Sequence, residues 1–386
     1  MSANRRTGAH MRSKNILLAG VLASIPAIAH AQMAEADVAT GKIANQYICT
    51  FDASVGRADV DRETGKAVGK AMGEVLFTYK KAIRGFAVRM PAMPDRSPVA
   101  ELKANNSKIA ACEQDQIAKA LVQGKGKPGG GTPSGETVDW GVTNVGGGSS
   151  PAGGRTAWVI DTGVDFDHPD LNVDSGRSVS YVGGSASDEN GHGTHVAGTI
   201  GAIDNEIGVK GVAPGATIVS VRVLNRRGSG TFSGVIAGVE YVADNGSPGD
   251  VANMSLGGGA SSALDNAVKN ASDQQIYFVL AAGNDGENAS SHSPARANGN
   301  YIYTIGAYSS SETWASFSNY SKSIVDYAAP GVSIKSTYKG GGYATLSGTS
   351  MAAPHVAGIL MTGAAGNVGT SGTIAGPDGS YSKAHE

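Results

Sequence analysis

From residue 155 onward, short apolar segments rich in β-branched residues alternate with longer stretches of small and apolar residues. The short segments have the length and composition of buried strands, and the longer ones have the length of helices. Such an alternation predicts an α/β domain with a doubly wound, mostly parallel sheet and helices on both faces. We expect strands at residues 157–160, 217–222, 251–253, 276–281 and 303–306, and helices at residues 192–203, 233–245, 260–272 and 350–361.

The first 31 residues are predicted to be a signal peptide. Basic residues precede an apolar run at residues 16–28, and the small-x-small sequence Ala29-His30-Ala31 then offers a cleavage site; Met11 is an alternative start. The apolar run is shorter than the roughly 18 residues needed to cross a bilayer, and no later segment reaches that length. We therefore expect a secreted protein that is extracellular, passing through or residing in the periplasm if the cell has one.

Composition limits the partners that the chain is expected to have. The 386 residues suffice for one large and one small domain, and the net charge is −2 at pH 7. A charge so close to zero indicates neither a nucleic acid nor a membrane surface as a partner. The 56 glycines predict many tight turns and closely packed backbone segments.

A small α+β unit is predicted before the α/β domain, and it has the β-α-β-β-α-β order of a ferredoxin-like fold. Its expected strands are residues 45–51, 75–79, 85–90 and 108–112, and its expected helices are residues 65–76 and 97–105. Neighbouring first and last strands would bring Cys49 near Cys112, the only two cysteines of the chain. An exported chain permits a disulfide there, and two buried free thiols are the alternative. Residues 125–135 (KGKPGGGTPSG) have the composition of a flexible linker.

The sequence Gly348-Thr349-Ser350 opens an apolar run that is long enough for a buried helix. Ser350 would then lie at a helix N-terminus, where free N–H groups favour negative charge. A hydroxyl there, beside a base, can attack a carbonyl while adjacent amides receive the oxyanion. A lone serine at this position would otherwise be an N-cap.

Three other segments supply groups that could act with Ser350. Asp161 ends an apolar strand, at the sheet edge where catalytic groups gather, although such a residue is usually a turn former. His192 lies between glycines that allow close backbone approach, and it is the candidate base. Asn284 ends another apolar strand, where its side-chain N–H₂ is a neutral donor suited to an oxyanion. His195 follows His192 at i+3 without a nearby Glu or Cys, so we expect a core histidine and no catalytic metal.

Together, the sequences VIDTGVD, GHGTHVAG and GTSMAAP, in this order with Ala282-Gly283-Asn284 between the last two, resemble the subtilases, the subtilisin and proteinase K type of serine protease. The resemblance spans about residues 140–358. It implies that Ser350 is the nucleophile, His192 the general base and then acid, and Asp161 the residue that orients the imidazole. It also implies that Asn284 and the Ser350 amide form the oxyanion hole.

The resemblance further implies how a peptide substrate and a cation are bound. The peptide is expected to lie as an added strand between two segments, with a pocket wall and an aromatic rim nearby. These residues are Ser229 and Gly230, Ser255, Leu256 and Gly257, Ala281, Ala282 and Gly283 for the wall, and Phe232 for the rim. A structural calcium ion is expected at oxygen ligands from Asp170, Ile203, Asn205, Ile207 and Val209, a polar surface turn being the alternative.

The resemblance also divides the chain. Residues 32–121 are expected to be a propeptide that acts as chaperone and inhibitor, residues 122–138 a linker and processing region, and residues 139–386 the catalytic domain. Self-cleavage is expected after Leu121, with a mature N-terminus between Val122 and Glu136 and a monomeric mature enzyme that acts on proteins and peptides. Residues 363–386 are expected to form loop or a frayed tail instead of the family's paired C-terminal helices.

Two other classes of function remain as alternatives. One is a binding module that keeps the fold without turnover, which the intact set of catalytic residues opposes. The other is a nucleotide-binding enzyme that uses Asp161, which lacks support because no G-x-G-x-x-G motif follows a strand into a helix.

Overall fold

The computed structural model describes residues 41–93, 95–129, 135–150, 152–362 and 367–386. The predicted signal peptide and parts of the predicted linker lie outside these residues. No helix within the described ranges is both long and apolar enough to cross a membrane.

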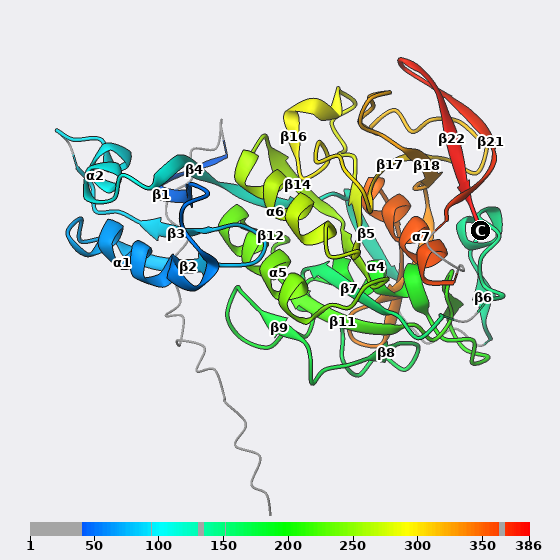
Figure 1. Ribbon diagram of the computed structural model, residues 1–386. Coiled ribbons are helices and arrows are strands. Elements are labelled where there is room, and N and C mark those ends of the chain that lie inside the picture. Colours follow the sequence, from blue (N-terminus) through cyan, green and yellow to red (C-terminus); the bar gives the residue numbers. More distant parts are fainter. Residues whose placement is uncertain (1–40, 94, 130–134, 151, 363–366) are drawn as a thin grey trace, which may run out of the picture. The chain divides into compact units, whose positions relative to one another are not determined.

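A ten-stranded sheet forms the centre of the larger domain (Figure 1). Its strands pair in parallel, except for the last hairpin. In spatial order they are β21 (Gly369–Gly376), β22 (Gly379–His385), β18 (Tyr327–Pro330), β17 (Ile302–Tyr308), β15 (Tyr277–Ala281), β13 (Val251–Met254), β7 (Thr156–Asp161), β11 (Thr217–Arg222) and β8 (Asn172–Val173), and β9 (Val179–Ser180) also pairs with β11. The predicted doubly wound, mostly parallel sheet is confirmed.

Helices cover both faces of this sheet. One apolar core contains side chains of α5 (Phe232–Asn245) and α6 (Ser262–Ser272), which lie side by side (Figure 1). The other core contains side chains of α4 (His192–Gly201) and α7 (Thr349–Thr362). The sequence predicted all four helices to within a few residues. The predicted start at residue 260 is two residues early, because Ser261 caps α6 by accepting the Leu264 amide.

Shorter elements surround the central sheet. The three-stranded sheet β19-β20-β5 packs on α4 through β19. The short elements are β5 (Gln123–Gly129), β6 (Thr137–Val138), α3 (Trp140–Asn144), β10 (Val209–Lys210), β12 (Ser229–Thr231), β14 (Leu256–Gly259), β16 (His292–Ser293), β19 (Ile334–Tyr338) and β20 (Gly342–Ser347).

The N-terminal domain has the predicted element order and pairs its strands in the order β4-β1-β3-β2. Its elements are β1 (Lys42–Phe51), α1 (Val60–Gly69), β2 (Glu74–Tyr79), β3 (Gly85–Arg89), α2 (Pro98–Asn105) and β4 (Ile109–Ala120). The predicted helix at residues 65–76 is wrong in its bounds. It begins earlier and ends at Gly69, because a left-handed turn at Met72 (φ 53°) redirects the chain into β2.

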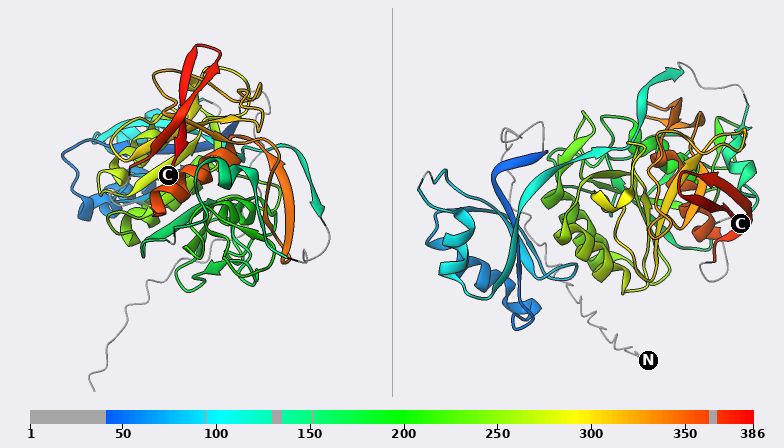
Figure 2. Two further views of the ribbon diagram at one scale, coloured as in Figure 1. Left: turned by 90° about the vertical axis from the view of Figure 1, so that its right-hand side faces the viewer. Right: turned by 90° about the horizontal axis from the view of Figure 1, so that it is seen from above.

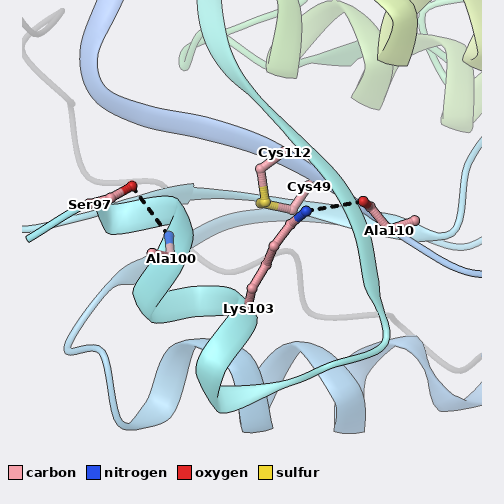
Figure 3. Close-up of a disulfide and its surroundings, with 6 residues drawn as sticks. All are labelled: Cys49, Ser97, Ala100, Lys103, Ala110 and Cys112. Atoms are coloured by element: carbon pink, nitrogen blue, oxygen red, sulfur yellow. Dashed lines mark hydrogen bonds between the residues drawn. A yellow bond between two sulfur atoms is a disulfide. The ribbon is translucent and has the colours of Figure 1, made fainter.

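Cys49 and Cys112 form a disulfide between β1 and β4 (Figure 3). The two residues are direct partners in the antiparallel pairing of these strands. Cys49 is completely buried in the core of the domain. The structure therefore shows the disulfide, and the alternative of two free thiols is wrong.

Three further predictions from composition are wrong. The last strand of the N-terminal domain does not end at residue 112 but continues to Ala120, because it pairs with β12 and β14 of the larger domain. The first part of the predicted linker is strand β5, since its backbone pairs with β20. The predicted C-terminal tail is the hairpin β21–β22 (red in Figure 2), in which Tyr381 is buried against Trp314 at a ring distance of 4.6 Å.

Candidate active site

Asp161 and His192 meet at the end of the buried strand β7. Asp161 is its last residue, and His192 is the first residue of α4. The His192 Nδ1–H donates to Asp161 Oδ1 at 2.8 Å, and both side chains are buried. Glycine is required at position 193, because a Cβ there would lie 2.1 Å from the carbonyl oxygen of Gly163. The sequence thus lets the helix approach the strand end closely enough to form the pair.

The surroundings of His192 favour its charged form. Burial alone lowers the pKa of the imidazole, but the carboxylates of Asp161 and Asp188 outweigh that effect and raise it overall. The pair is therefore suited to accept a proton on Nε2 while Nδ1 stays bound to Asp161. Nε2 is buried and has no hydrogen-bond partner among the described residues.

Asp188 is a residue that the sequence reasoning missed. Its carboxylate accepts the Thr162 hydroxyl at 3.0 Å, after the end of β7, and the Gly191 amide at 2.9 Å. It also accepts the amide and the hydroxyl of Thr194, at 3.0 and 2.7 Å. Asp188 thereby fixes the first turn of α4 to the end of β7. An acidic residue just before a helix start was the available signal.

Ser350 lies in the first turn of α7 and is buried. Its hydroxyl donates to the carbonyl oxygen of Ser255 at 2.8 Å, and the Ser255 hydroxyl donates to the Ser350 carbonyl oxygen at 2.9 Å. The structure therefore brings α7 and α4 into one core but shows no hydrogen bond between Ser350 and His192.

Asn284 directly follows β15 and is held by the start of α7. Its Oδ1 accepts the amide and the hydroxyl of Thr349, at 2.9 and 2.8 Å. This leaves Nδ2 buried, without a hydrogen-bond partner among the described residues. A buried unpartnered N–H₂ group is costly in free energy, which fits a donor reserved for a ligand oxygen.

The end of β4 lies along the residues that were predicted to bind substrate. Ser229 and Gly230 of β12 pair with Lys119 and Ala118, in an antiparallel register. On the other side of β4, Leu256 and Gly257 of β14 pair with Ala120 and Lys119. The Leu121 amide also donates to the Ser255 carbonyl oxygen at 3.2 Å. Residues 117–121 of the chain thus form the middle strand between two others.

The bond between Leu121 and Val122 lies beside Gly348 and the side chain of Asn284. A Cβ placed on Gly348 would lie 2.5 Å from the Leu121 carbonyl oxygen and 3.0 Å from Asn284 Nδ2. It would also lie 3.3 Å from the Val122 Cα. The Leu121 carbonyl oxygen and Asn284 Nδ2 therefore both lie close to Gly348, two residues before Ser350.

The residues that were predicted to form the substrate pocket lie in different surroundings. A Cβ on Gly257 would lie 3.3 Å from Leu121 Cδ1, so Gly257 lies against this side chain. Phe232 is completely buried in the same core cluster as Ala118 of β4. The predicted wall residues Ala281, Ala282 and Gly283 are buried at the end of β15 and in the segment that leads to Asn284.

The residues predicted to bind calcium form a loop around Asp170. Asp170 Oδ2 accepts the Val209 amide at 3.0 Å, and the Asp170 carbonyl oxygen accepts the Ile203 amide at 3.0 Å. Asn205 Oδ1 accepts the Ile207 amide at 3.2 Å. Asp170 Oδ1 is buried without a hydrogen-bond partner in the described part of the chain.

This loop fits a hard cation. Burial raises the pKa of Asp170 to about 6, and a buried carboxylate oxygen without a hydrogen-bond partner is a suitable cation ligand. The side chain of Glu136 lies next to the loop and was missed from the sequence; its Oε1 accepts the Asn205 amide at 2.9 Å. Within the described ranges, no group of three or more His, Cys, Asp or Glu side chains is arranged to hold a metal.

His195 is a hydrogen-bonded core histidine, as predicted. Its Nε2 lies 3.0 Å from the Ile334 carbonyl oxygen and 3.2 Å from that of Ala344. Burial lowers the pKa of His195 to about 3, so the ring is neutral and Nε2–H donates.

The resemblance found in the sequence is supported by comparison with known proteins. A family model described as the subtilase family matches residues 156–365. The chain belongs to the subtilase family. This subtilase is 53% identical over 212 residues to the alkaline serine exoprotease A of Vibrio alginolyticus, a match that covers 53% of this chain and 38% of that protein.

Two further proteins extend the comparison. The subtilase is 41% identical over 308 residues to the extracellular serine proteinase of Thermus sp. (strain Rt41A), which covers 76% of this chain and 69% of that protein. Its fold is similar to the crystal structure of a cold adapted subtilisin-like serine proteinase. That comparison has a TM-score of 0.51 and 48% identity, and it covers 57% of this chain and 82% of the other.

Proposed function

We propose that this subtilase is a secreted serine endopeptidase. Ser350 Oγ turns from the Ser255 carbonyl oxygen toward His192 Nε2, gives it its proton and attacks the carbonyl carbon of the scissile peptide bond. Asp161 holds the imidazole in the required tautomer and stabilises the imidazolium. His192 then protonates the leaving amine, and water hydrolyses the acyl-enzyme.

The oxyanion of each tetrahedral intermediate is received by Asn284 Nδ2 and the Ser350 amide. Both groups have the chemistry that this task needs, because they are neutral donors fixed before the reaction begins. The Asn284 side chain is oriented by the two hydrogen bonds from Thr349, so its N–H₂ needs no reorganisation.

One observation supports this proposal most strongly, namely the position of the chain's own Leu121–Val122 bond. Residues 117–121 lie as an antiparallel strand between β12 and β14, in the manner of a bound peptide. The Leu121 carbonyl oxygen lies beside the oxyanion donor. We propose that the precursor cuts this bond itself and that residues 32–121 inhibit the enzyme until they are removed.

We further propose that calcium stabilises the mature fold. Asp170 and the loop at residues 203–209 would hold the ion, with Glu136 beside them. The ion would satisfy the buried Asp170 Oδ1 and carry no step of the reaction. Secretion is proposed from the signal sequence, and the name of the Thermus relative, an extracellular proteinase, agrees with it.

A fluorophosphonate probe tests the proposed catalytic centre. We expect the processed wild-type protein to be labelled on Ser350 and to hydrolyse denatured proteins, whereas Ser350→Ala and His192→Ala proteins do neither. A serine that is not labelled in a folded, processed protein would indicate a binding module that keeps the fold without turnover.

A further inference from the structure

The chain that follows the Leu121–Val122 bond does not leave the protein surface. Residues 123–129 form strand β5, which adds to β20 as the third strand of the sheet β19-β20-β5. The pairing is antiparallel: Gln123 lies opposite Ser347, and after an irregularity in the register residues 127–129 lie opposite Thr345, Ala344 and Tyr343. Gln123 also donates from its side-chain amide to the Asn284 carbonyl oxygen at 2.9 Å.

We propose that β20 binds the part of a polypeptide substrate that follows the cut, as an added antiparallel strand reaching to the eighth residue after the scissile bond. This inference rests on the proposed function. The occupant is the extended backbone of any protein substrate, for which the precursor's own residues 122–129 are the example in the structure.

The geometry of β20 supports this assignment. The strand ends at Ser347, directly before Gly348, which lies against the Leu121 carbonyl oxygen. A polypeptide whose scissile bond lies at the position of Leu121–Val122 therefore continues directly along the edge of β20. Edges of this kind pair with an extended chain through main-chain hydrogen bonds, irrespective of its side chains.

The edge is also rigidly supported. His195 Nε2 donates to the carbonyl oxygens of Ile334 and Ala344, one on each strand of the hairpin β19–β20. The Ser336 and Thr337 hydroxyls donate to backbone carbonyls of α4, at 2.8 and 2.7 Å. The docking strand is therefore fastened to the helix that carries His192. A strand fixed before binding loses little freedom when a peptide adds to it.

The side chains of β20 are compatible with a strand that binds its partner through backbone hydrogen bonds. Ala344 and Leu346 are buried, whereas Thr345 between them is exposed. On the opposite edge β20 is already paired with β19. The edge occupied by β5 is therefore the one that a substrate can use once residues 122–129 have moved away.

Peptides cleaved by the processed enzyme test this proposal. Two peptides share the sequence IAKAL before the cut and carry after it either VQ or VQGKGKPG, as in the chain. We expect kcat/KM to be about tenfold higher for the longer arm. A tenfold change corresponds to about 1.4 kcal/mol, which one or two backbone hydrogen bonds supply. Equal kcat/KM values for the two peptides would overturn the proposal and leave the proposed protease function intact.

A second pair of peptides separates strand pairing from a general effect of length. N-methyl groups are placed on alternate residues of the eight-residue arm, at positions 3 and 5 in one peptide and at positions 4 and 6 in the other, because the amide of position 1 belongs to the scissile bond and position 7 is proline. Alternate amides of a strand face its partner, so one peptide should lose the gain and the other should keep it. Equal behaviour of the two peptides contradicts the proposal. The variant Thr345→Ala, which removes only an exposed side chain, should keep the gain.

Discussion

Reduction of the Cys49–Cys112 disulfide should destabilise the N-terminal domain without affecting the catalytic domain. The two cysteines are the only ones in the chain, so a reductant has no other target. They are 63 residues apart, and the bridge closes most of the domain into one loop. A loop of that length corresponds to about 4 kcal/mol of stabilisation, mainly through the entropy of the unfolded state.

That magnitude is large for a domain that spans residues 42–120. Single domains of this size are stable by about 4–12 kcal/mol, so reduction should remove at least about a third of the domain's stability. Its strand β4 places residues 117–120 between β12 and β14, and Cys112 of the same strand forms the disulfide. We therefore expect reduction to weaken inhibition and to accelerate the appearance of activity from the wild-type precursor.

Native-state hydrogen exchange on the Ser350→Ala precursor measures the effect directly, since we expect this variant not to digest itself. Amides of β1 and β3 should exchange up to about a thousandfold faster after reduction, because 1.4 kcal/mol is a factor of ten. Amides of β13 and β15 are the internal control and should not change. Unchanged exchange in β1 and β3 would refute the reasoning. So would a response to reductant in the double variant Cys49→Ser/Cys112→Ser.

Three further predictions concern the catalytic domain. Asp188→Asn removes a negative charge that raises the pKa of His192, so the acid limb of kcat/KM should move to lower pH; a limb that stays in place or moves up would contradict the role of Asp188. Chelation of divalent cations should lower the temperature of half-inactivation, because the buried Asp170 Oδ1 would lose its partner; unchanged inactivation would argue against the calcium site. Tyr381→Ala removes a buried ring stacked on Trp314 and should lower the free energy of unfolding by about 3–5 kcal/mol. Unfolding in urea measures this loss, with Tyr381→Phe as the control. A loss below about 1 kcal/mol would mean that the hairpin is not part of the core.

The sequence predicted those parts of the fold whose pattern is local. Buried parallel strands are continuous apolar runs, and their predicted ends at Asp161 and Asn284 were correct to within three residues because each run stops at a polar residue. The helices that carry His192 and Ser350 were found for the same reason. The structure places Asp161 against His192, as the motifs predicted, whereas the Ser350 hydroxyl donates to the Ser255 carbonyl oxygen, a contact that no sequence pattern encodes.

The remaining elements depend on long-range pairing. Residues 123–129 are glycine-rich and hydrophilic, and they form a strand only because the edge of β20 accepts any backbone. The C-terminal hairpin has few apolar residues, so its stability comes from contacts such as Tyr381 with Trp314, which are distant in sequence. Glu136 and Asp188 were missed because a single acidic residue in a polar segment is usually a solvated surface residue.

The central claim is that Ser350 cuts the chain's own backbone beside Asn284, and it is tested by mass analysis of two precursors incubated side by side. The wild-type protein should shed its first domain through a cut after Leu121 and end with an N-terminus between Val122 and Glu136. The Ser350→Ala protein should stay at full precursor length. Processing of the isolated variant at the same bond, or an active wild-type enzyme that still begins upstream of Leu121, would contradict the account.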